Sequence, residues 1–350
     1  MKGTVFHVKQ KSDSKYYSPK LLFSHNCITS FVMSPRGLGK TYGGKCLMID
    51  NYKKKGKQSV YMRRTQAEMD ICVKTFFDKV KKLYPDDEFE VKGKSGFQQG
   101  FINGEVFIHF IALSTSINHK SGEFPDVTLI MFDEYVIPMR SNKKYLPDEM
   151  FLYLEIISTI GRDRDDYKIY ICANAISYVN PFFTFFNIEP DSNKRFQKFQ
   201  NNTICLELFT SNKYKEELVK TQFGKMISGT KYFSYAVDNE VYEDTNDFIL
   251  ERNGTDYSFI SSFKTRGYEI GIWFDRNSGI YLCDNKVDPM SKYKYYLRHD
   301  ESQQGYQHIG IGRTETWRVK DIKKEFMQSN LYYVNQEVKK FFQNEVIRFL

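Results

Sequence analysis

Residues 34–41 read Ser-Pro-Arg-Gly-Leu-Gly-Lys-Thr, the pattern of a phosphate-binding loop. The preceding residues 28–33 favour a buried strand, and residues 42–53 can form a helix. Backbone N–H groups and the positive end of that helix would then converge on a polyphosphate. The usual first glycine is serine here, so an ordinary strand-to-helix turn is the alternative. The predicted nucleotide-binding residues are Ser34, Pro35, Arg36, Gly37, Leu38, Gly39, Lys40 and Thr41.

Two acidic residues, Asp133 and Glu134, follow a continuous apolar run at residues 127–132. Such a run is typical of a central parallel strand that is covered on both faces. In a P-loop ATPase, Lys40 would reach the β- and γ-phosphates of ATP, and Thr41 and Asp133 would hold Mg²⁺. Glu134 would be the general base that activates water. Two solvated acids at a strand end are the alternative. The Asp-Glu order predicts the ASCE type of ATPase, which has an extra strand between the motifs.

The composition limits the possible classes of protein. The chain has 350 residues, enough for one sizeable domain and a smaller one. No apolar run approaches the roughly 20 residues that span a bilayer, and the N-terminal residues lack a signal-peptide core, so we expect no membrane partner. The 6 cysteines are scattered, which favours free thiols over disulfides or zinc. A net charge of +8 suits a polyanionic partner but is modest for a dedicated DNA-binding protein.

Strand-like and helix-like segments alternate through roughly the first 200 residues, the pattern of an α/β domain with a mostly parallel central sheet. Beyond the two motifs, we predict strands at 58–64 and 167–174, a hairpin at 101–111 around Asn103 and Gly104, and helices at 67–84 and near 147–159.

The pattern changes after residue 190. Residues 211–227 read as a charged helix, a hairpin follows at 268–283, and two further helices are predicted at 319–327 and 334–349. We therefore predict an ATPase domain at 1–207, a short helical linker at 208–232 and a smaller α+β domain at 233–350.

A set of short motifs follows the phosphate-binding loop along the rest of the chain. They are Tyr-Met-Arg-Arg at 61–64, Lys-Ser at 120–121 with Pro125, Arg-Asp-Arg at 162–164, Cys-Ala-Asn-Ala at 172–175, Val-Asn-Pro at 179–181, Asn-Lys-Arg at 193–195, Thr-x-Phe-Gly at 221–224 and Gly-Ile-Trp-x-Asp at 271–275. In their order and spacing, these motifs resemble the DNA packaging ATPases of phi29-like tailed phages. That family is related to the large terminases and to the FtsK/HerA pumps.

The resemblance implies a homomeric ring, usually of five subunits, at the portal vertex of an empty capsid in the host cytoplasm. Such a ring hydrolyses ATP with Mg²⁺ to drive double-stranded DNA into the capsid. The implied partners are therefore double-stranded DNA, further copies of the chain, the portal (connector) protein and a packaging RNA that anchors the ring.

The resemblance also implies roles for three further polar residues. Asn174 would sense the γ-phosphate, although a cap of the following turn is the alternative. Arg162 would complete the site of a neighbouring subunit, because a planar and permanently charged group can neutralise the transition state. Arg164 is the competing candidate, and a solvated charge run would explain both arginines. Lys120 matches a second basic residue at the shared site, or is a surface lysine.

The resemblance places a DNA-contacting pore loop at Arg63 and Arg64, where mobile cations would follow phosphates without reading bases. A lysine expected just beyond them is Gln66 here. Lys54 and Lys55 belong to a second candidate basic patch, although a basic helix end can also be simply solvated.

The smaller domain is predicted to be a degenerate RNase-H-like nuclease that docks RNA or the portal. Asp238, Asp275 and Asp284 lie in or beside its strand-like segments, so a terminase with an active, metal-dependent nuclease stays open. The third class is a helicase loader of the AAA+ kind. It would carry a helical lid after the ATPase core, whereas strands follow a short helical linker here.

Overall fold

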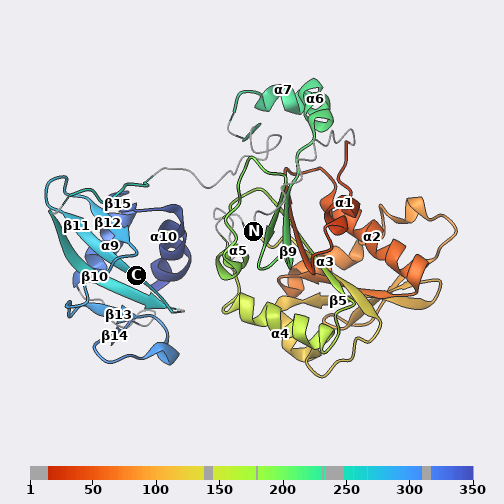
Figure 1. Cartoon of the computed structure of the whole chain (residues 1–350), viewed down its shortest axis with the longest axis horizontal. Helices are drawn as coiled ribbons and strands as arrows, with labels where there is room; N and C mark the ends of the chain where they lie inside the picture. Colours follow the sequence, from red (N-terminus) through yellow and green to blue (C-terminus); the bar gives the residue numbers. More distant parts are fainter. Residues whose placement is uncertain are drawn as a thin grey trace. The chain divides into compact units, whose positions relative to one another are not determined.

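The computed structural model describes residues 15–137, 145–178, 180–230, 232–233, 248–254, 256–265, 267–309 and 317–349. The chain divides into two compact units, Met1–Glu243 and Asp244–Leu350, and each has its own sheet and hydrophobic core (Figure 1). The helices of the predicted linker lie within the first unit. Over the described residues, no helix has both the length and the apolar character needed to cross a bilayer.

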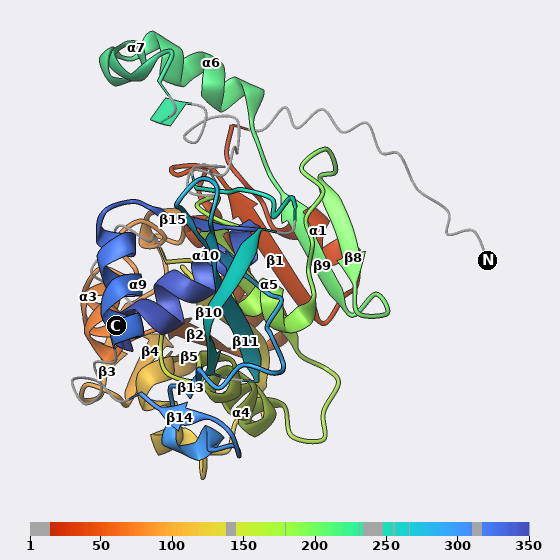
Figure 2. The same ribbon diagram turned by 90° about the vertical axis from the view of Figure 1, so that its left-hand side faces the viewer.

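The first unit is built on a sheet with the strand order β3-β4-β5-β2-β6-β7-β1-β9-β8. All neighbours from β5 to β9 in this order are parallel, and an antiparallel strand or hairpin flanks each edge. Figure 2 shows β1 next to β9, with β8 at the edge. The strands are β1 (Thr29–Ser34), β2 (Gln58–Arg63), β3 (Phe89–Lys92), β4 (Gln98–Ile102), β5 (Glu105–Ala112), β6 (Val127–Asp133), β7 (Lys168–Asn174), β8 (Phe196–Phe199) and β9 (Ile204–Leu208).

Helices cover both faces of this sheet, which explains why its central strands are continuous apolar runs. One core includes residues of α4 and α5, and the other includes residues of α1, α2 and α3. The helices are α1 (Lys20–Ser24), α2 (Lys40–Lys55), α3 (Gln66–Lys74), α4 (Glu149–Gly161), α5 (Pro181–Phe186), α6 (Asn212–Lys220) and α7 (Gln222–Ile227), with 3-10 turns at Lys81–Leu83 and Leu113–His119. The predicted α/β class is confirmed.

The predicted helix at 67–84 is wrong in its second half. The structure has α3, which ends at Lys74, and then a separate 3-10 turn at Lys81–Leu83. Between them, the adjacent side chains of Phe76 and Phe77 are both buried in the same core. Thr75, with φ −121° and ψ 16°, is the residue at which α3 ends, and the two phenylalanines follow it. The hairpin at Asn103 and Gly104 is confirmed, and both residues have positive φ as its turn requires.

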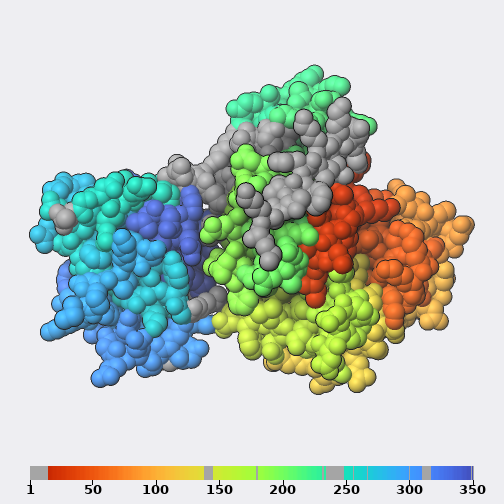
Figure 3. All heavy atoms as spheres, in the orientation of Figure 1, coloured from red at the N-terminus to blue at the C-terminus, as the bar shows by residue number. Residues whose placement is uncertain are grey.

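The predicted helix at 211–227 is two helices, α6 and α7. Thr221 separates them because its hydroxyl accepts the N–H of Gly224 and so caps α7. A Cβ at Gly224 would lie 1.9 Å from the carbonyl oxygen of Leu218, so this tight corner requires glycine. In Figures 1 and 2, α6 and α7 stand out from the rest of the first unit, and they form a separate lobe in the space-filling view (Figure 3).

The second unit has a six-stranded sheet with the order β14-β13-β10-β11-β12-β15. Strands β12, β11 and β10 form an antiparallel meander, and β13 and β14 continue it in parallel. Helices α9 and α10 contribute to the core that covers one sheet face. The elements are β10 (Tyr257–Thr265), β11 (Tyr268–Asp275), β12 (Tyr281–Asp284), β13 (Lys294–Tyr296), β14 (Gln307–His308), α9 (Trp317–Met327), β15 (Leu331–Tyr333) and α10 (Gln336–Phe341), followed by a π-helical turn at Phe342–Val346 and 3-10 turns at Ile347–Phe349 and, earlier, His299–Glu301. The α+β prediction for this part is confirmed, whereas its nuclease-like ancestry stays a prediction.

Candidate active site

The loop at residues 34–41 joins the buried strand β1 to the N-terminus of α2. Gly37 and Gly39 both have φ 88°, a backbone conformation that L side chains rarely adopt. The two glycines therefore allow the loop to turn, and Gly39 is the residue from which α2 begins. The predicted strand, loop and helix are all present in this order, and the serine in place of the first glycine is the last residue of β1.

Lys40 lies inside this loop and is only 7% exposed. Its Nζ donates to the carbonyl oxygens of Ser34 and Pro35, each at 3.0 Å, and to the hydroxyl of Ser34 at 2.7 Å. It also donates to Oδ1 of Asn174 at 3.2 Å, from the tip of the neighbouring strand β7. Burial lowers the pKa of Lys40 to about 8, so the ammonium is held close to its titration point.

The carboxylate of Asp133 faces the first turn of α2 and is buried. The Thr41 hydroxyl lies 3.0 Å and 3.1 Å from its two oxygens. The Tyr61 hydroxyl donates to it at 2.8 Å and the Cys172 thiol at 3.0 Å. Burial and the adjacent carboxylate raise the pKa of Cys172, which keeps this thiol protonated and able to donate. An Nη of Arg63, 3.2 Å away, completes the surroundings of the acid.

Glu134 follows directly and is turned toward the open cleft. Its φ of 62° bends the chain after β6, while its N–H donates to the carbonyl oxygen of Cys172 at 2.8 Å. Its carboxylate is half exposed and accepts from Arg63 at 2.6 Å. Burial alone would lower the pKa of Arg63, but Asp133 and its other neighbours raise it above the ordinary value, so this guanidinium stays charged between the two acids.

The loop, the two acids and Asn174 border one cleft of about 480 Å³. The segment after α3 contributes the opposite wall. Its lining residues are Arg36, Gly37, Gly39, Lys40, Thr41, Tyr42, Lys45, Thr75, Asp78, Lys79, Asp133, Glu134, Ala173 and Asn174. Four of them are Arg or Lys and three are Asp or Glu, so cations for an anionic ligand lie beside acids that suit a divalent metal.

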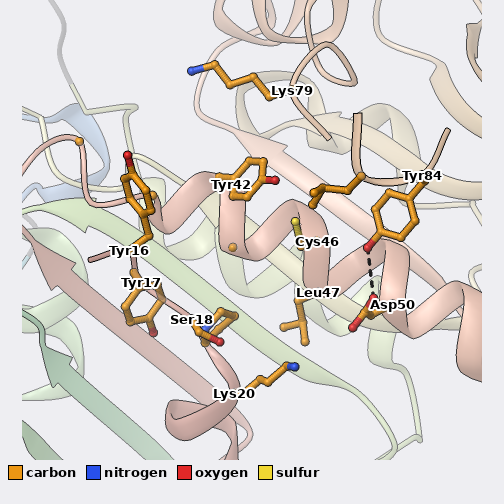
Figure 4. Close-up of a pocket in the computed structure, with 15 residues that line it drawn as sticks. Tyr16, Tyr17, Ser18, Lys20, Tyr42, Cys46, Leu47, Asp50, Lys79 and Tyr84 are labelled. Atoms are coloured by element: carbon orange, nitrogen blue, oxygen red, sulfur yellow. Dashed lines mark hydrogen bonds between the residues drawn. The ribbon is translucent and has the colours of Figure 1, made fainter. Parts of the chain in front are cut away.

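A second pocket, of about 730 Å³, adjoins this cleft and shares Gly37, Gly39, Tyr42 and Lys79 with it (Figure 4). One side is α2, from which Tyr42, Cys46, Leu47 and Asp50 project. The Tyr84 hydroxyl donates to Asp50 at 3.2 Å.

The other side of this pocket is the segment before α1, which includes Tyr16 and Tyr17. The N–H of Tyr17 donates to the carbonyl oxygen of Leu38 at 2.8 Å and so ties that segment to the loop. The pocket is therefore rich in tyrosines, and a backbone hydrogen bond holds one of its sides against the phosphate-binding loop.

Arg63 and Arg64 do not reach outward as the predicted DNA-binding pair. They are 6% and 3% exposed, because both side chains fold onto carboxylates. Arg64 makes a bidentate pair with Glu149, at 2.8 Å and 3.0 Å, and donates to the carbonyl oxygens of Glu134 and Tyr135. In this structure the two arginines organise the acidic side of the cleft, and their contact with DNA stays a prediction.

Arg162 lies at the C-terminus of α4, close to the start of β6. Its Nη2 donates to the carbonyl oxygen of Gly122 at 3.1 Å, and half of its side chain is exposed. Its φ of 44° and ψ of −126° are rarely adopted by non-glycine residues. Since β6 has 7 residues, its two ends are about 20 Å apart. Arg162 is therefore remote from Asp133 and Glu134 of its own chain.

Arg164, the competing candidate, has a structural role. Its guanidinium donates to four backbone carbonyl oxygens, at distances from 2.8 Å to 3.1 Å. These belong to Phe124, Pro125, Val127 and Ile160, so Arg164 fastens the start of β6 to α4. The guanidinium of Arg164 is occupied by these four bonds, whereas half of the Arg162 side chain is exposed. Of the two arginines, Arg162 is therefore the better placed to contact another molecule.

Lys120 lies near Arg162, outside the cleft. Its Nζ pairs with Glu155 of α4 at 2.8 Å, and nearly half of the side chain is exposed. Lys54 and Lys55 are at the opposite end of α2 from the loop, and 16 residues of helix separate the two ends by about 24 Å. Both are exposed, and Lys54 makes an i,i+4 ion pair with Asp50.

Of the three acids predicted for nuclease chemistry, the two that the structure describes each have partners of their own. Asp275 is a turn residue that accepts from Ser278 and from the N–H of Asn277. Asp284 is buried and pairs with Arg252 at 3.2 Å. Asp238 lies outside the described residues. Among the residues that the structure describes, no group of three or more Asp, Glu, His or Cys side chains could hold a metal ion.

Sequence reasoning missed Tyr61 and Cys172 as contacts of Asp133 and assigned Arg63 to a different task. Part of the information needed to place Arg63 near Asp133 was present in the sequence, because each of these residues ends a strand. Strands β2 and β6 pair with Met62 opposite Phe132, which sets Arg63 beside Asp133. That adjacency depends on strand order, which the sequence motifs alone do not determine.

Comparisons with known proteins identify the family of this chain. The model of the Podovirus DNA encapsidation protein (Gp16) family matches residues 11–349. The DNA packaging protein of Bacillus phage phi29 is 33% identical over 326 residues, which is 93% of this chain and 95% of that protein. The DNA packaging protein of Bacillus phage B103 is 32% identical over 315 residues, or 90% and 95% of the two chains.

Solved structures give the same result. A chain of the bacteriophage phi29 viral genome packaging motor assembly is similar over 96% of this chain and 100% of its own length, with 30% identity and a TM-score of 0.72. The crystal structure of the N-terminal domain of the phi29 DNA packaging ATPase matches 57% of this chain and 100% of its own, with 33% identity and a TM-score of 0.52. The chain thus belongs to the Podovirus DNA encapsidation protein (Gp16) family.

Proposed function

We propose that this chain is an ATP-driven motor that translocates double-stranded viral DNA into a preformed capsid. One observation carries the proposal: the Thr41 hydroxyl lies within 3.1 Å of both oxygens of Asp133, at the mouth of the loop that holds Lys40. The two motifs of a P-loop ATPase thereby meet in a single cleft. Because the chain belongs to a family of DNA encapsidation proteins, we infer that ATP hydrolysis in this cleft drives the movement of DNA.

The polar groups of the cleft suit a magnesium nucleotide. Lys40 and the backbone N–H groups at the start of α2 would bind the β- and γ-phosphates. A hydroxyl and a carboxylate are the hard oxygen ligands that Mg²⁺ takes, so Thr41 and Asp133 fit the metal. The metal, when bound, would supply positive charge against the phosphate oxygens. Asn174, already 3.2 Å from Lys40, would contact the γ-phosphate.

The adjoining aromatic pocket would receive the base and ribose of ATP. It shares the two loop glycines with the phosphate cleft, so one extended ligand can occupy both spaces. Tyr16 and Tyr42 offer ring faces for a planar base.

Glu134 would take the proton from the attacking water. It is turned into the cleft, and Arg63 donates to Oε2 only, which leaves Oε1 for the proton. Arg63 would hold both carboxylates in position. Its guanidinium is permanently charged, so it would not take the proton itself. This arrangement supports hydrolysis by an activated water without a covalent intermediate.

A second subunit would complete the site. Arg162 is too far from its own cleft to act there, and Lys120 lies near it on the same surface. Both cations would therefore serve the neighbouring copy in a homo-oligomeric ring of five subunits. An arginine inserted in this way can accelerate phosphoryl transfer by about 10³–10⁵-fold. The similarity to a chain of the phi29 packaging motor assembly supports a ring at the portal vertex, assembled in the host cytoplasm.

DNA would be held through its phosphates, which a motor must bind without regard to sequence. Of the four cations predicted for this task, Lys54 and Lys55 are exposed, whereas Arg63 and Arg64 are buried, so we favour the two lysines. The second unit would dock the portal protein or a packaging RNA. A cleavage assay on supercoiled DNA with Mn²⁺ separates this role from that of a terminase nuclease, since robust cutting would reveal the nuclease.

The decisive experiment on function is ATP turnover by the full chain with and without long duplex DNA, first alone and then on assembled capsids. We expect duplex DNA to stimulate turnover, and we expect Lys40→Ala to abolish both basal and stimulated turnover. If duplex DNA does not change the rate of ATP turnover, the protein is an ATPase and the proposed motor function is wrong.

A further inference from the structure

Tyr214 of α6 rests directly on the phosphate-binding loop. Its hydroxyl donates to the carbonyl oxygen of Arg36 at 3.3 Å. A Cβ added at Gly37 would lie 2.7 Å from this hydroxyl oxygen, closer than real Cβ atoms come to other atoms. Gly37 thus meets two demands at once: it provides the positive φ of the loop, and it leaves room for the tyrosine.

The start of α6 is fixed next to the strand that leads into the loop. The N–H of Phe209 donates to the carbonyl oxygen of Met33 at 2.9 Å, one residue before the loop begins. The Ser211 side chain then caps the helix by accepting the N–H of Tyr214 at 3.2 Å. A backbone hydrogen bond at Phe209 and the side-chain cap of Ser211 therefore hold the start of α6 in place, with Tyr214 over the loop.

A second contact ties α6 to the segment before α1. Lys15 forms an ion pair with Glu217, one helical turn after Tyr214. Next to Lys15 is Tyr16, whose side chain lies 3.8 Å from the Cβ position of Gly39. Each loop glycine is thus covered by a tyrosine, and Lys15 and Glu217 join the two segments that carry them.

The loop that Tyr214 touches is held by bonds of Lys40 that phosphate binding would change. Lys40 donates to the carbonyl oxygens of Ser34 and Pro35, and it must give up some of these bonds to reach a phosphate. The carbonyl group of Pro35 is next to that of Arg36, so its release would act on the backbone beside the atom that Tyr214 contacts. Because 3.3 Å is long for an O–H···O hydrogen bond, a small shift either strengthens it or breaks it.

From these contacts, we infer that Tyr214 is a positioning residue that couples the nucleotide state of the phosphate-binding loop to helices α6 and α7. The inference rests on the proposed nucleotide binding at this loop. In the sequence, α6 and α7 come after the last strand of the first unit and before the second unit. A change at the phosphate-binding loop would therefore reach the second unit through these two helices. Coupling of this kind requires a contact that differs between the two states, and the bond from Tyr214 to Arg36 would be that contact.

The test is hydrogen–deuterium exchange of the full chain, with and without saturating ATPγS and Mg²⁺. In the wild type, we expect nucleotide to change the exchange of the α6 amides by about fivefold or more, the lower end of allosteric coupling. In Tyr214→Phe, which loses only the hydroxyl, we expect less than half of this response. Tyr214→Ala, which also loses the ring, should lose it almost completely.

The matched control is Tyr293→Phe, the same change at an exposed tyrosine of the second unit, and its α6 response should equal that of the wild type. Saturation is verified for each protein by the protection of the loop peptide itself. A protected loop with an unchanged α6 in the wild type, or a full response in both Tyr214 variants, would overturn the coupling. Absence of loop protection in the wild type would instead refute nucleotide binding, and with it the proposed function.

Discussion

The guanidinium of Arg63 binds the carboxylate of Glu134 at 2.6 Å, and its other Nη lies 3.2 Å from Asp133. One buried arginine therefore orients both acids that the proposed mechanism uses. This arrangement gives the neighbouring acids different surroundings, since Asp133 is enclosed by donors and Glu134 opens to the cleft. Different surroundings for two adjacent acids are what separate roles in metal binding and proton transfer require.

Replacing Glu134 by glutamine should separate binding from chemistry. Glutamine keeps the shape and can still accept from Arg63, but it is a far weaker base. We expect nucleotide affinity to persist while turnover falls by about 10²–10⁴-fold. Equilibrium nucleotide binding and steady-state turnover measure the two quantities. Undiminished hydrolysis would remove Glu134 as the base.

Arg63→Ala distinguishes an active-site arginine from a DNA-contacting one. Because Arg63 pairs with both acids, we expect basal turnover without DNA to fall by roughly tenfold or more, about 1.4 kcal/mol in the barrier. A DNA-gripping residue would affect only the turnover that DNA stimulates. Lys54→Ala is the matched control, since its cation is exposed and distant from the acids. Normal basal turnover in Arg63→Ala would contradict this active-site role and favour the predicted contact with DNA.

Mixing subunits tests whether Arg162 acts on a neighbour. Doping Arg162→Ala chains into wild-type rings should inhibit turnover more than in proportion to their fraction, because each variant disables the site of another subunit. Arg164→Ala serves as the comparison, and we expect it to lower the thermal midpoint because its guanidinium joins α4 to the start of β6. A strictly linear loss with the Arg162 variant would show that the arginine acts within its own chain.

The pH dependence of nucleotide binding should report the buried Lys40. In the free protein its pKa is about 8, and bound phosphates favour the charged form and raise that pKa. Binding must then take up a proton at high pH, so affinity should be flat below about pH 7.5 and fall more than tenfold by about pH 9.5. Lys40→Arg provides the control, since a guanidinium does not titrate in this range and its residual binding should stay flat. Isothermal titration calorimetry in buffers of different ionisation enthalpy measures the proton uptake directly, and its absence at about pH 9 would contradict the assignment.

Breaking the buried ion pair of Arg64 and Glu149 should destabilise the first unit. Both side chains are nearly fully buried, so Arg64→Ala would leave a carboxylate without its partner. We expect a loss of about 3–5 kcal/mol in the free energy of unfolding of the first unit. The exposed pair of Lys54 and Asp50 should contribute no more than about 0.5 kcal/mol. Thermal and denaturant midpoints of Arg64→Ala and Lys54→Ala make the comparison, and equal midpoints would be inconsistent with a buried ion pair.

The sequence was sufficient to predict structure that depends on neighbouring residues in the chain, such as the strand, loop and helix at the phosphate-binding site. Gly37 and Gly39 have the positive φ that the loop motif requires, and Asn174 lies beside Lys40 because the carboxyl ends of neighbouring parallel strands meet. The apolar runs of β1 and β6 are buried because helices cover both sheet faces.

What the sequence could not predict depends on contacts between distant segments. Arg63 reads as an exposed cation until β2 is known to pair with β6, and the partner of Arg64 is 85 residues away. Tyr214 gave no signal at all, because a tyrosine on a charged helix has no pattern that points to a loop 178 residues earlier. Strand order and helix docking, rather than local preference, decide these three roles.

The central claim is that one magnesium nucleotide binds between the phosphate-binding loop and the tip of β6. A structure of the full chain with a non-hydrolysable ATP analogue and Mg²⁺ tests this most directly. We expect the triphosphate against Lys40 and the metal density between Thr41 and Asp133. A nucleotide that binds elsewhere, or a metal with no contact to either residue, would contradict the account.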